Sequence, residues 1–122
     1  MEPFQEQFVV HLNAGIANGG QFMTVPARKR AVIEHVSVSA DPPGANTANY
    51  FITSTIGNSP TANFREVPIF TARTQGTNVV IGSHPIRAYA NPGTEFGAVI
   101  RRIETSHEVI ATFVLAGHYE PV

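Results

Sequence analysis

The sequence predicts a single all-β domain over residues 1–122, an antiparallel β-sandwich or jelly roll of eight or nine strands. Ten glycines and nine prolines interrupt the chain at short intervals, which leaves few stretches long enough for a helix. The segments between them are rich in Val, Ile, Thr, Phe and Tyr and often alternate apolar with polar residues, as half-buried strands do. A chain of 122 residues fits one domain with one hydrophobic core.

The expected strands follow one another at the spacing of a sandwich or jelly roll. In chain order they cover residues 4–12, 21–25, 31–40, 49–56, 64–73, 78–81, 84–90, 95–103 and 108–118. Asn18-Gly19-Gly20 and Gln75-Gly76-Thr77 have the composition of tight turns. Asn91-Pro92-Gly93-Thr94 predicts a type II turn, with proline and glycine at its two central positions.

Two strands carry an irregularity. Ile33 has one strand parity and Val36 and Val38 have the other, which predicts a β-bulge near Glu34-His35. Pro68 cannot donate a hydrogen bond to a ladder, so its strand is expected at a sheet edge or with a bulge.

Residues 105–116 fit two structures. Thr105-Ser106-His107-Glu108 has the spacing of a helix capping box, and Gly117 could end a buried helix. However, residues 109–114 are apolar on both faces and largely β-branched, as in a central strand. We favour the strand.

Composition and charge limit the classes of partner that we expect for this protein. The net charge is −1, and the only basic run is Arg28-Lys29-Arg30, so we expect no nucleic acid as a partner. We interpret the basic run as a solvated loop or an anchor for a partner's carboxylate. The lack of cysteine excludes disulfides and thiolate chemistry. No apolar run has the length of a membrane span, and residues 1–6 do not resemble a signal peptide. The compartment is left open, although a surface rich in Thr, Ser, Asn and Gln is common in extracellular and virion β-proteins.

Three segments resemble a set of small, uncharacterised bacterial β-sandwich proteins. They are Val25-Pro26-Ala27-Arg28-Lys29-Arg30 with the following Ile33-Glu34-His35-Val36-Ser37, then Pro85-Ile86-Arg87-Ala88-Tyr89-Ala90-Asn91-Pro92-Gly93-Thr94, and the closing Leu115-Ala116-Gly117-His118-Tyr119. The proteins of this set have a VPAGKR…IEHVS segment and a PVRLYADPGT segment. Arg28 stands where they have glycine, so we expect the turn before residue 31 to differ from theirs. The resemblance implies the fold and names no activity.

The sequence lacks the spacings of known catalytic and metal sites. The five histidines include no His-x-His pair: His11, His35, His84, His107 and His118. No nucleophile elbow, P-loop or dinucleotide fingerprint is present. We therefore expect no catalytic residue, metal or cofactor. Arg101-Arg102 fall on opposite strand faces, so at most one points inward, with a glutamate expected as its partner.

One group of residues could bind a ligand. Arg87 and Tyr89 share a face of their strand, and His84 comes just before. Together with the loop residues Asn46 and Asn49, they could hydrogen-bond and stack on a sugar or grip another subunit.

Three functions follow from these observations. The preferred one is a non-catalytic interaction or assembly module that associates with copies of itself or with another protein. The second is a carbohydrate-binding module or lectin. The third is a cupin-like, metal-dependent enzyme.

Overall fold

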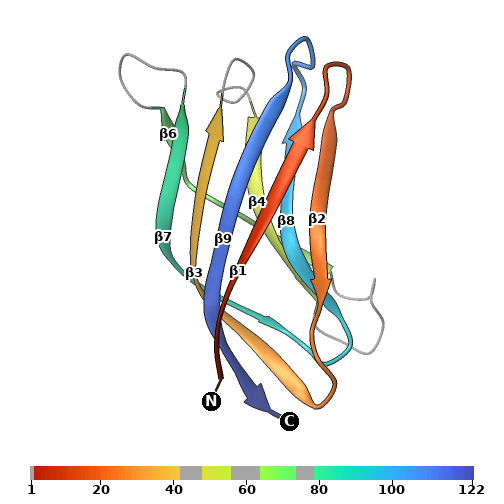
Figure 1. The fold of residues 1–122 in the computed structure, drawn as a ribbon, viewed down its shortest axis with the longest axis vertical. Coiled ribbons are helices and arrows are strands. Elements are labelled where there is room, and N and C mark those ends of the chain that lie inside the picture. Colours follow the sequence, from red (N-terminus) through yellow and green to blue (C-terminus); the bar gives the residue numbers. More distant parts are fainter. Residues whose placement is uncertain (1, 42–47, 56–63, 74–78) are drawn as a thin grey trace.

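The structure, a computed structural model, is a β-sandwich of one five-stranded and one four-stranded antiparallel sheet (Figure 1). It describes residues 2–41, 48–55, 64–73 and 79–122. The described part contains no helix. Its strands are β1 (Glu2–Leu12), β2 (Asn18–Thr24), β3 (Lys29–Asp41), β4 (Ala48–Thr55), β5 (Phe64–Pro68), β6 (Ala72–Arg73), β7 (Val80–Ala90), β8 (Glu95–Arg102) and β9 (Val109–Pro121).

The strand order is that of a jelly roll. One sheet has the order β1-β9-β3-β7-β6 and the other β2-β8-β4-β5. The pairs are nested along the chain, because β1 pairs with β9, β2 with β8, β3 with β7 and β4 with β5. A long hairpin rolled up so that its successive pairs alternate between two sheets gives this order. The predicted fold class is therefore confirmed, in its jelly-roll form.

The core lies between the sheets and is built by the alternation seen in the sequence. In β1, for example, Phe4, Phe8, Val10 and Leu12 are buried, while the residues between them are mostly exposed. The ring of Phe96 lies between those of Phe4 and Phe8, with ring centroids 5.7 and 6.2 Å apart. Each such side chain contributes roughly 1.5–3 kcal/mol by leaving water.

The predicted bulge is confirmed. The register of β3 shifts between Ile33 and His35 against both neighbouring strands. Glu34 is the extra residue against β9, whereas against β7 the extra residue is on β7, where Ile86 and Arg87 lie opposite Glu34. Gly117 of β9 faces this point, and a Cβ added to it would lie 1.8 Å from the carbonyl oxygen of Val32. The missing side chain therefore permits the close approach of β9 to the bulged strand.

The two ambiguous segments are resolved. Residues 109–116 belong to β9, which lies between β1 and β3, so the choice of a central strand is correct. The expected strand 64–73 is two strands in different sheets. β5 ends at Pro68 on the edge of the four-stranded sheet, and the chain then crosses to β6 on the edge of the other sheet (Figure 1).

One of the predicted turns is confirmed and one is wrong. Gly93 has φ +76°, and the Thr94 N–H donates to the Asn91 carbonyl oxygen at 3.1 Å. In contrast, Asn18-Gly19-Gly20 lies within β2, and the turn is earlier, at Gly15, which has φ +91°. Gly20 serves close packing, because a Cβ there would lie 2.7 Å from the Ala98 carbonyl oxygen. The expected turn at residues 75–77 lies outside the described residues.

The turn before β3 has a strained residue. The Lys29 N–H donates to the Pro26 carbonyl oxygen at 3.3 Å, and Arg28 has φ +64°. Glycine adopts such a φ without a steric penalty, whereas other L-residues rarely do. Arg28 thus has a backbone conformation that glycine would adopt without strain.

Arg102 corrects the expectation of a glutamate partner. Its side chain points into the sandwich and is buried. Its guanidinium donates hydrogen bonds to three backbone carbonyl oxygens: those of Asn13, Ile16 and His107. Arg102 is the last residue of β8, and the backbone carbonyls of the neighbouring loops have no partners in a strand ladder. The planar guanidinium has several donors and satisfies three of these carbonyls at once.

Candidate functional site

The structure describes four of the five predicted site residues and brings two of these four together. Arg87 and Tyr89 lie on the outer face of β7, where the Arg87 Nη1 donates to the Tyr89 hydroxyl at 3.4 Å. His84 has the opposite strand parity and faces the other way. Asn49 is exposed on β4, in the other sheet, and Asn46 lies outside the described residues.

His84 joins β7 to the segment that crosses from β5 to β6. Its ring centroid lies 5.6 Å from that of Phe70, and its Nε2 accepts a hydrogen bond from the Phe70 backbone N–H at 3.2 Å. Its Nδ1 lies 2.9 Å from the Pro85 carbonyl oxygen. These contacts fit a neutral ring with its proton on Nδ1. His84 therefore fastens the sheet edge and does not join Arg87 and Tyr89 in a binding site.

Arg87 and Tyr89 belong instead to a charged cluster that the sequence did not reveal. We call it the charged cluster; its members are Arg30, Glu34, Arg87, Tyr89, His118 and Glu120. They come from three neighbouring strands, because Val32 of β3 is in register with both Tyr89 of β7 and His118 of β9. Only the strand register, including the bulge at Glu34, brings them together.

Each charge in the cluster has a close polar neighbour. Arg30 Nε donates to a Glu120 carboxylate oxygen at 2.8 Å, and this hydrogen bond holds the pKa of Glu120 below its usual value. The Arg30 guanidinium also lies over the Tyr89 ring, 5.3 Å from its centroid. The hydrogen bond to Tyr89 raises the pKa of Arg87.

His118 lies between the two carboxylates of the cluster. Its Nδ1 is 2.6 Å from Glu34 Oε1 and its Nε2 is 3.8 Å from Glu120 Oε2. Within the described ranges, no group of three or more His, Cys, Asp or Glu side chains is arranged to hold a metal ion. The cluster offers ion-pairing and hydrogen-bonding groups at one end of the sheet.

Next to the cluster, the outer face of the five-stranded sheet has a stretch of described side chains without Asp, Glu, Lys or Arg. We call this region the neutral face. The strand registers place these side chains on it: Gln5, Gln7 and Val9 of β1; Ile110, Thr112, Val114 and Ala116 of β9; Ser37 and Ser39 of β3; and Ile81, Ser83 and Pro85 of β7. Three of the large apolar side chains are well exposed: Val9 at 45%, Ile81 at 46% and Ile110 at 39%. Among the described side chains, these positions on four adjacent strands carry no Asp, Glu, Lys or Arg. His35 lies among them, with its Nε2 3.4 Å from Ser83 Oγ, and the ion pair of His11 with Glu108 borders them beside Ile110.

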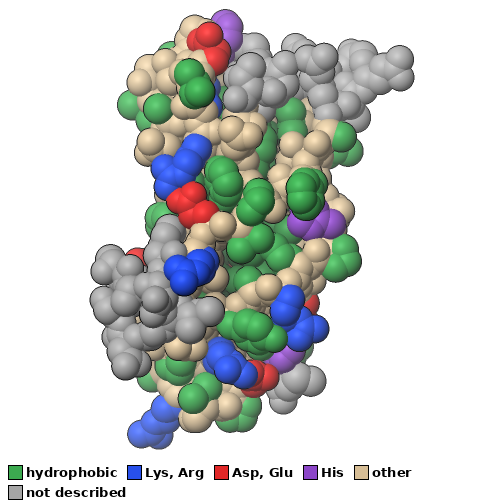
Figure 2. Space-filling model, turned by 180° about the vertical axis from the view of Figure 1, so that it is seen from behind, with side chains coloured by type: hydrophobic (Ala, Val, Ile, Leu, Met, Phe, Trp, Pro, Cys, Tyr) green, Lys and Arg blue, Asp and Glu red, His purple; other side chains and the backbone are tan. Residues whose placement is uncertain are grey.

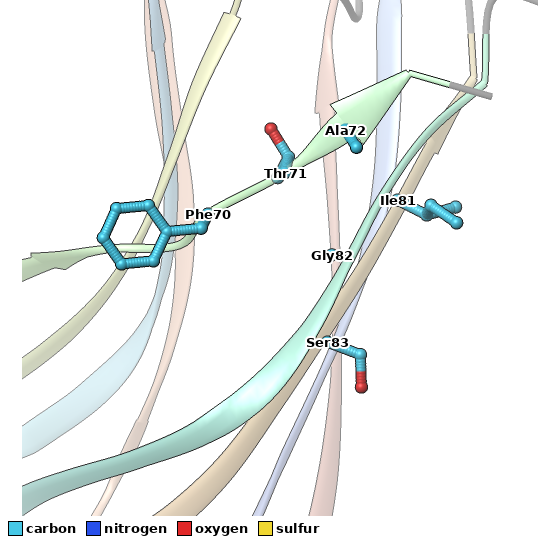
Figure 3. Close-up of a pocket in the computed structure, with 6 residues that line it drawn as sticks. All are labelled: Phe70, Thr71, Ala72, Ile81, Gly82 and Ser83. Carbon is cyan, nitrogen blue, oxygen red and sulfur yellow. The ribbon is translucent and has the colours of Figure 1, made fainter. Parts of the chain in front are cut away.

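A shallow hollow of about 480 Å³ lies at the β6–β7 edge. It is lined by Phe70, Thr71, Ala72, Ile81, Gly82 and Ser83 (Figure 3). A Cβ on Gly82 would lie 2.5 Å from the Phe70 carbonyl oxygen, so the crossing segment sits tightly against β7. The lining has two hydroxyls and no charged group, which gives a small ligand few orienting contacts.

On the reverse side, the described side chains form no patch of one charge sign. Figure 2 shows Lys and Arg side chains scattered among hydrophobic and acidic ones. On the outer face of the four-stranded sheet, Arg101 Nε donates to both carboxylate oxygens of Glu66, at 2.9 and 3.1 Å. This mixture of charges provides no basic track for a phosphate backbone among the described residues.

The comparisons with known proteins identify no family. No protein-family model matches the chain, and no curated protein matches its sequence. The resemblance to small bacterial β-sandwich proteins therefore stays a prediction. In the described part of the chain, no helix is long and apolar enough to cross a membrane.

Proposed function

We propose that this protein is a non-catalytic jelly-roll module that works by self-association and that the neutral face is its main contact. The observation that carries the proposal is the exposure of apolar side chains on a stretch of sheet whose described side chains include no Asp, Glu, Lys or Arg. Interface cores are depleted in Lys, Glu and Asp, and this is what separates them from ordinary protein surface.

The centre of the neutral face supports this proposal. Val114 and Thr112 of β9 are half-buried, and the more exposed Ile110 and Val9 lie beside them on β9 and β1. These β-branched side chains are held by the sheet with few free rotamers, so ordering them in a contact costs little entropy. A flat, preformed surface of this kind suits another rigid sheet.

Charge balance favours a second copy as the partner. The described side chains of the neutral face include no Asp, Glu, Lys or Arg that would repel their own counterparts. The charged cluster beside it carries two arginines and two glutamates, Arg30, Arg87, Glu34 and Glu120, and therefore adds no net charge when His118 is neutral. Two copies can thus meet through the same surface without like-charge repulsion, as a two-fold symmetric contact requires.

The test compares two isoleucines. Ile110→Lys places a charge in the neutral face, whereas Ile103→Lys changes a side chain that is 99% exposed in the β8–β9 loop. We expect Ile110→Lys to weaken self-association by at least about tenfold, a cost of about 1.4 kcal/mol. Ile103→Lys should associate like the wild type.

The dissociation constants come from sedimentation equilibrium, and circular dichroism checks that both variants are folded. Equal association of the wild type and Ile110→Lys would rule out the neutral face as the contact. A wild type that stays monomeric at high concentration would rule out the proposed function itself.

The geometry favours the glycan-binding alternative less. Of the four described residues that were expected to bind a sugar, only Arg87 and Tyr89 come together, and the Arg30 guanidinium already lies over the Tyr89 ring. That contact occupies part of the aromatic surface on which a sugar would stack. The cupin-like alternative has no specific support from the described residues.

A further inference from the structure

Strand β7 has an edge that is only partly covered. Among the described residues, β6 is the strand on this side of β7, and it pairs with Val80 and Ile81 alone. The rest of β7 runs on to Ala90 with β3 on its other side. An edge strand of this kind presents free backbone N–H and C=O groups to another strand.

The contacts of His84 show which backbone groups point outward. The ring of His84 binds the Phe70 N–H, which belongs to the crossing segment on the open side of β7. The same ring contacts the carbonyl oxygen of Pro85, so that carbonyl also points to the open side. Alternate residues of a strand direct their N–H and C=O groups to the same side. The register with β3 is regular from Ala88 to Ala90, and the N–H of Asn91 goes to Thr55 and not to β3. Alternation from both ends therefore directs the backbone groups of Arg87 and Tyr89 to the open edge.

The chain limits the length of this edge at both ends. Pro85 has no N–H, and its carbonyl is engaged by His84. At the other end, the Asn91 N–H is used by the Thr55 carbonyl oxygen at 3.1 Å. Between these limits, Arg87 and Tyr89 offer two donors and two acceptors, which is the pattern of one short antiparallel pairing.

We propose that β7 pairs antiparallel with β7 of a second copy, centred on Ala88, so that Arg87 of each copy lies opposite Tyr89 of the other. The proposal rests on the proposed function of self-association but uses a different surface from the neutral face. In this register the two strands exchange four backbone hydrogen bonds across a two-fold axis. The two sheets then form one continuous sheet.

The side chains select this register over its neighbours. A pairing centred on Arg87 would place two guanidinium groups directly opposite each other, which is destabilising. A pairing centred on Tyr89 would set Arg87 against Asn91, whose N–H is already engaged. The pairing centred on Ala88 places a guanidinium beside an aromatic ring twice, which is a favourable cation–π arrangement.

The lack of cysteine allows a direct test by disulfide trapping. Ala88 would face Ala88 of the second copy as a non-hydrogen-bonded pair, with Cα atoms about 4.5 Å apart, which is within the range that a disulfide spans. The probe is the purified Ala88→Cys protein under a mild oxidant. The control is Thr24→Cys, which carries an exposed thiol on β2, in the other sheet. It reports random collisions.

We expect Ala88→Cys to form the disulfide-linked dimer at least about tenfold faster than Thr24→Cys, although Ala88 is only 6% exposed, because pairing raises the effective thiol concentration. Equal rates, or no linked dimer from Ala88→Cys, would overturn the proposed pairing.

Arg87→Pro gives a second readout without relying on a new thiol. It removes an N–H that points to the open edge, so the ladder with β3 is retained, and Arg87→Ala is the matched control that keeps this N–H. We expect Arg87→Pro to weaken association more than Arg87→Ala does. The edge pairing is wrong if Arg87→Pro associates like Arg87→Ala and Ala88→Cys forms no disulfide-linked dimer. The proposed function still stands in that case if the wild type associates and Ile110→Lys reduces the association.

Discussion

The buried guanidinium of Arg102 donates a hydrogen bond to the backbone carbonyl oxygen of Asn13 at 3.1 Å, which ties the end of β8 to the loop after β1. A second bond from its Nε reaches the Ile16 carbonyl oxygen at 3.0 Å. One side chain thus fixes the end of the sandwich at which the β1–β2 and β8–β9 connections meet.

Replacing Arg102 is therefore expected to be costly. Arg102→Met should lower the free energy of unfolding by about 3 kcal/mol, because buried carbonyls lose charge-assisted hydrogen bonds. Arg101→Met is the matched control, since its exposed ion pair with Glu66 should contribute less than about 1 kcal/mol. Urea unfolding followed by circular dichroism measures both. Equal losses would contradict the structural role of Arg102.

Arg28 provides a stabilising substitution. Its φ of +64° is strained for any side chain but free for glycine. Arg28→Gly should raise the free energy of unfolding by about 0.5–1 kcal/mol, after the added chain entropy of the unfolded glycine is taken into account. Arg28→Ala keeps the strain and should bring no such gain. A thermal melt in which glycine is no better than alanine would contradict the positive φ.

Gly117 is expected to tolerate no side chain. A Cβ would meet the backbone of Val32, which belongs to the bulged strand and cannot rotate away as a flexible side chain could. Gly117→Ala should therefore lower the free energy of unfolding by about 2 kcal/mol or more. Ala116→Gly, on the neighbouring residue, should cost only about 1 kcal/mol. A neutral Gly117→Ala in urea unfolding would argue against the close approach at the bulge.

The Arg101–Glu66 pair predicts a pH-dependent difference. The hydrogen bond from Arg101 holds the pKa of Glu66 below its usual value of 4.5, so its stabilising effect is present above that pH and is lost as the pH falls through the lowered folded-state pKa. At neutral pH the wild type should exceed Glu66→Gln by less than about 1 kcal/mol, because the pair is exposed. Unfolding curves at several pH values should show the difference vanish in acid. Glu120 titrates in both proteins and cancels in the comparison.

Much of the fold was predictable because alternation is a local property. The parity change between Ile33 and Val36 located the bulge, and the apolar residues around Phe113 identified β9 as a central strand. The turn expected at Gly19-Gly20 was wrong because glycine also serves close packing, which depends on partners distant in the sequence. The split of residues 64–73 between two sheets likewise depends on the roll of the hairpin.

The candidate site was less accessible from the sequence. Arg87 and Tyr89 could be paired, since residues two apart in a strand share a face. Glu34 and His118 are 84 positions apart and meet because the pairing of β3 with β9 places them side by side on the outer face. The inward parity of His84 could have been noticed from the alternation of its own strand, since it is shared with the buried Ala88.

The most direct measurement is the mass of the wild-type protein in solution from micromolar to about 1 mM, a range that covers weak and moderate association. Sedimentation equilibrium should show the mass rising with concentration above that of the 13.1 kDa monomer. Ile110→Lys should shift that rise to higher concentration, and Ile103→Lys should not. A mass that stays at 13.1 kDa over the whole range would contradict the proposal that this jelly roll works by self-association.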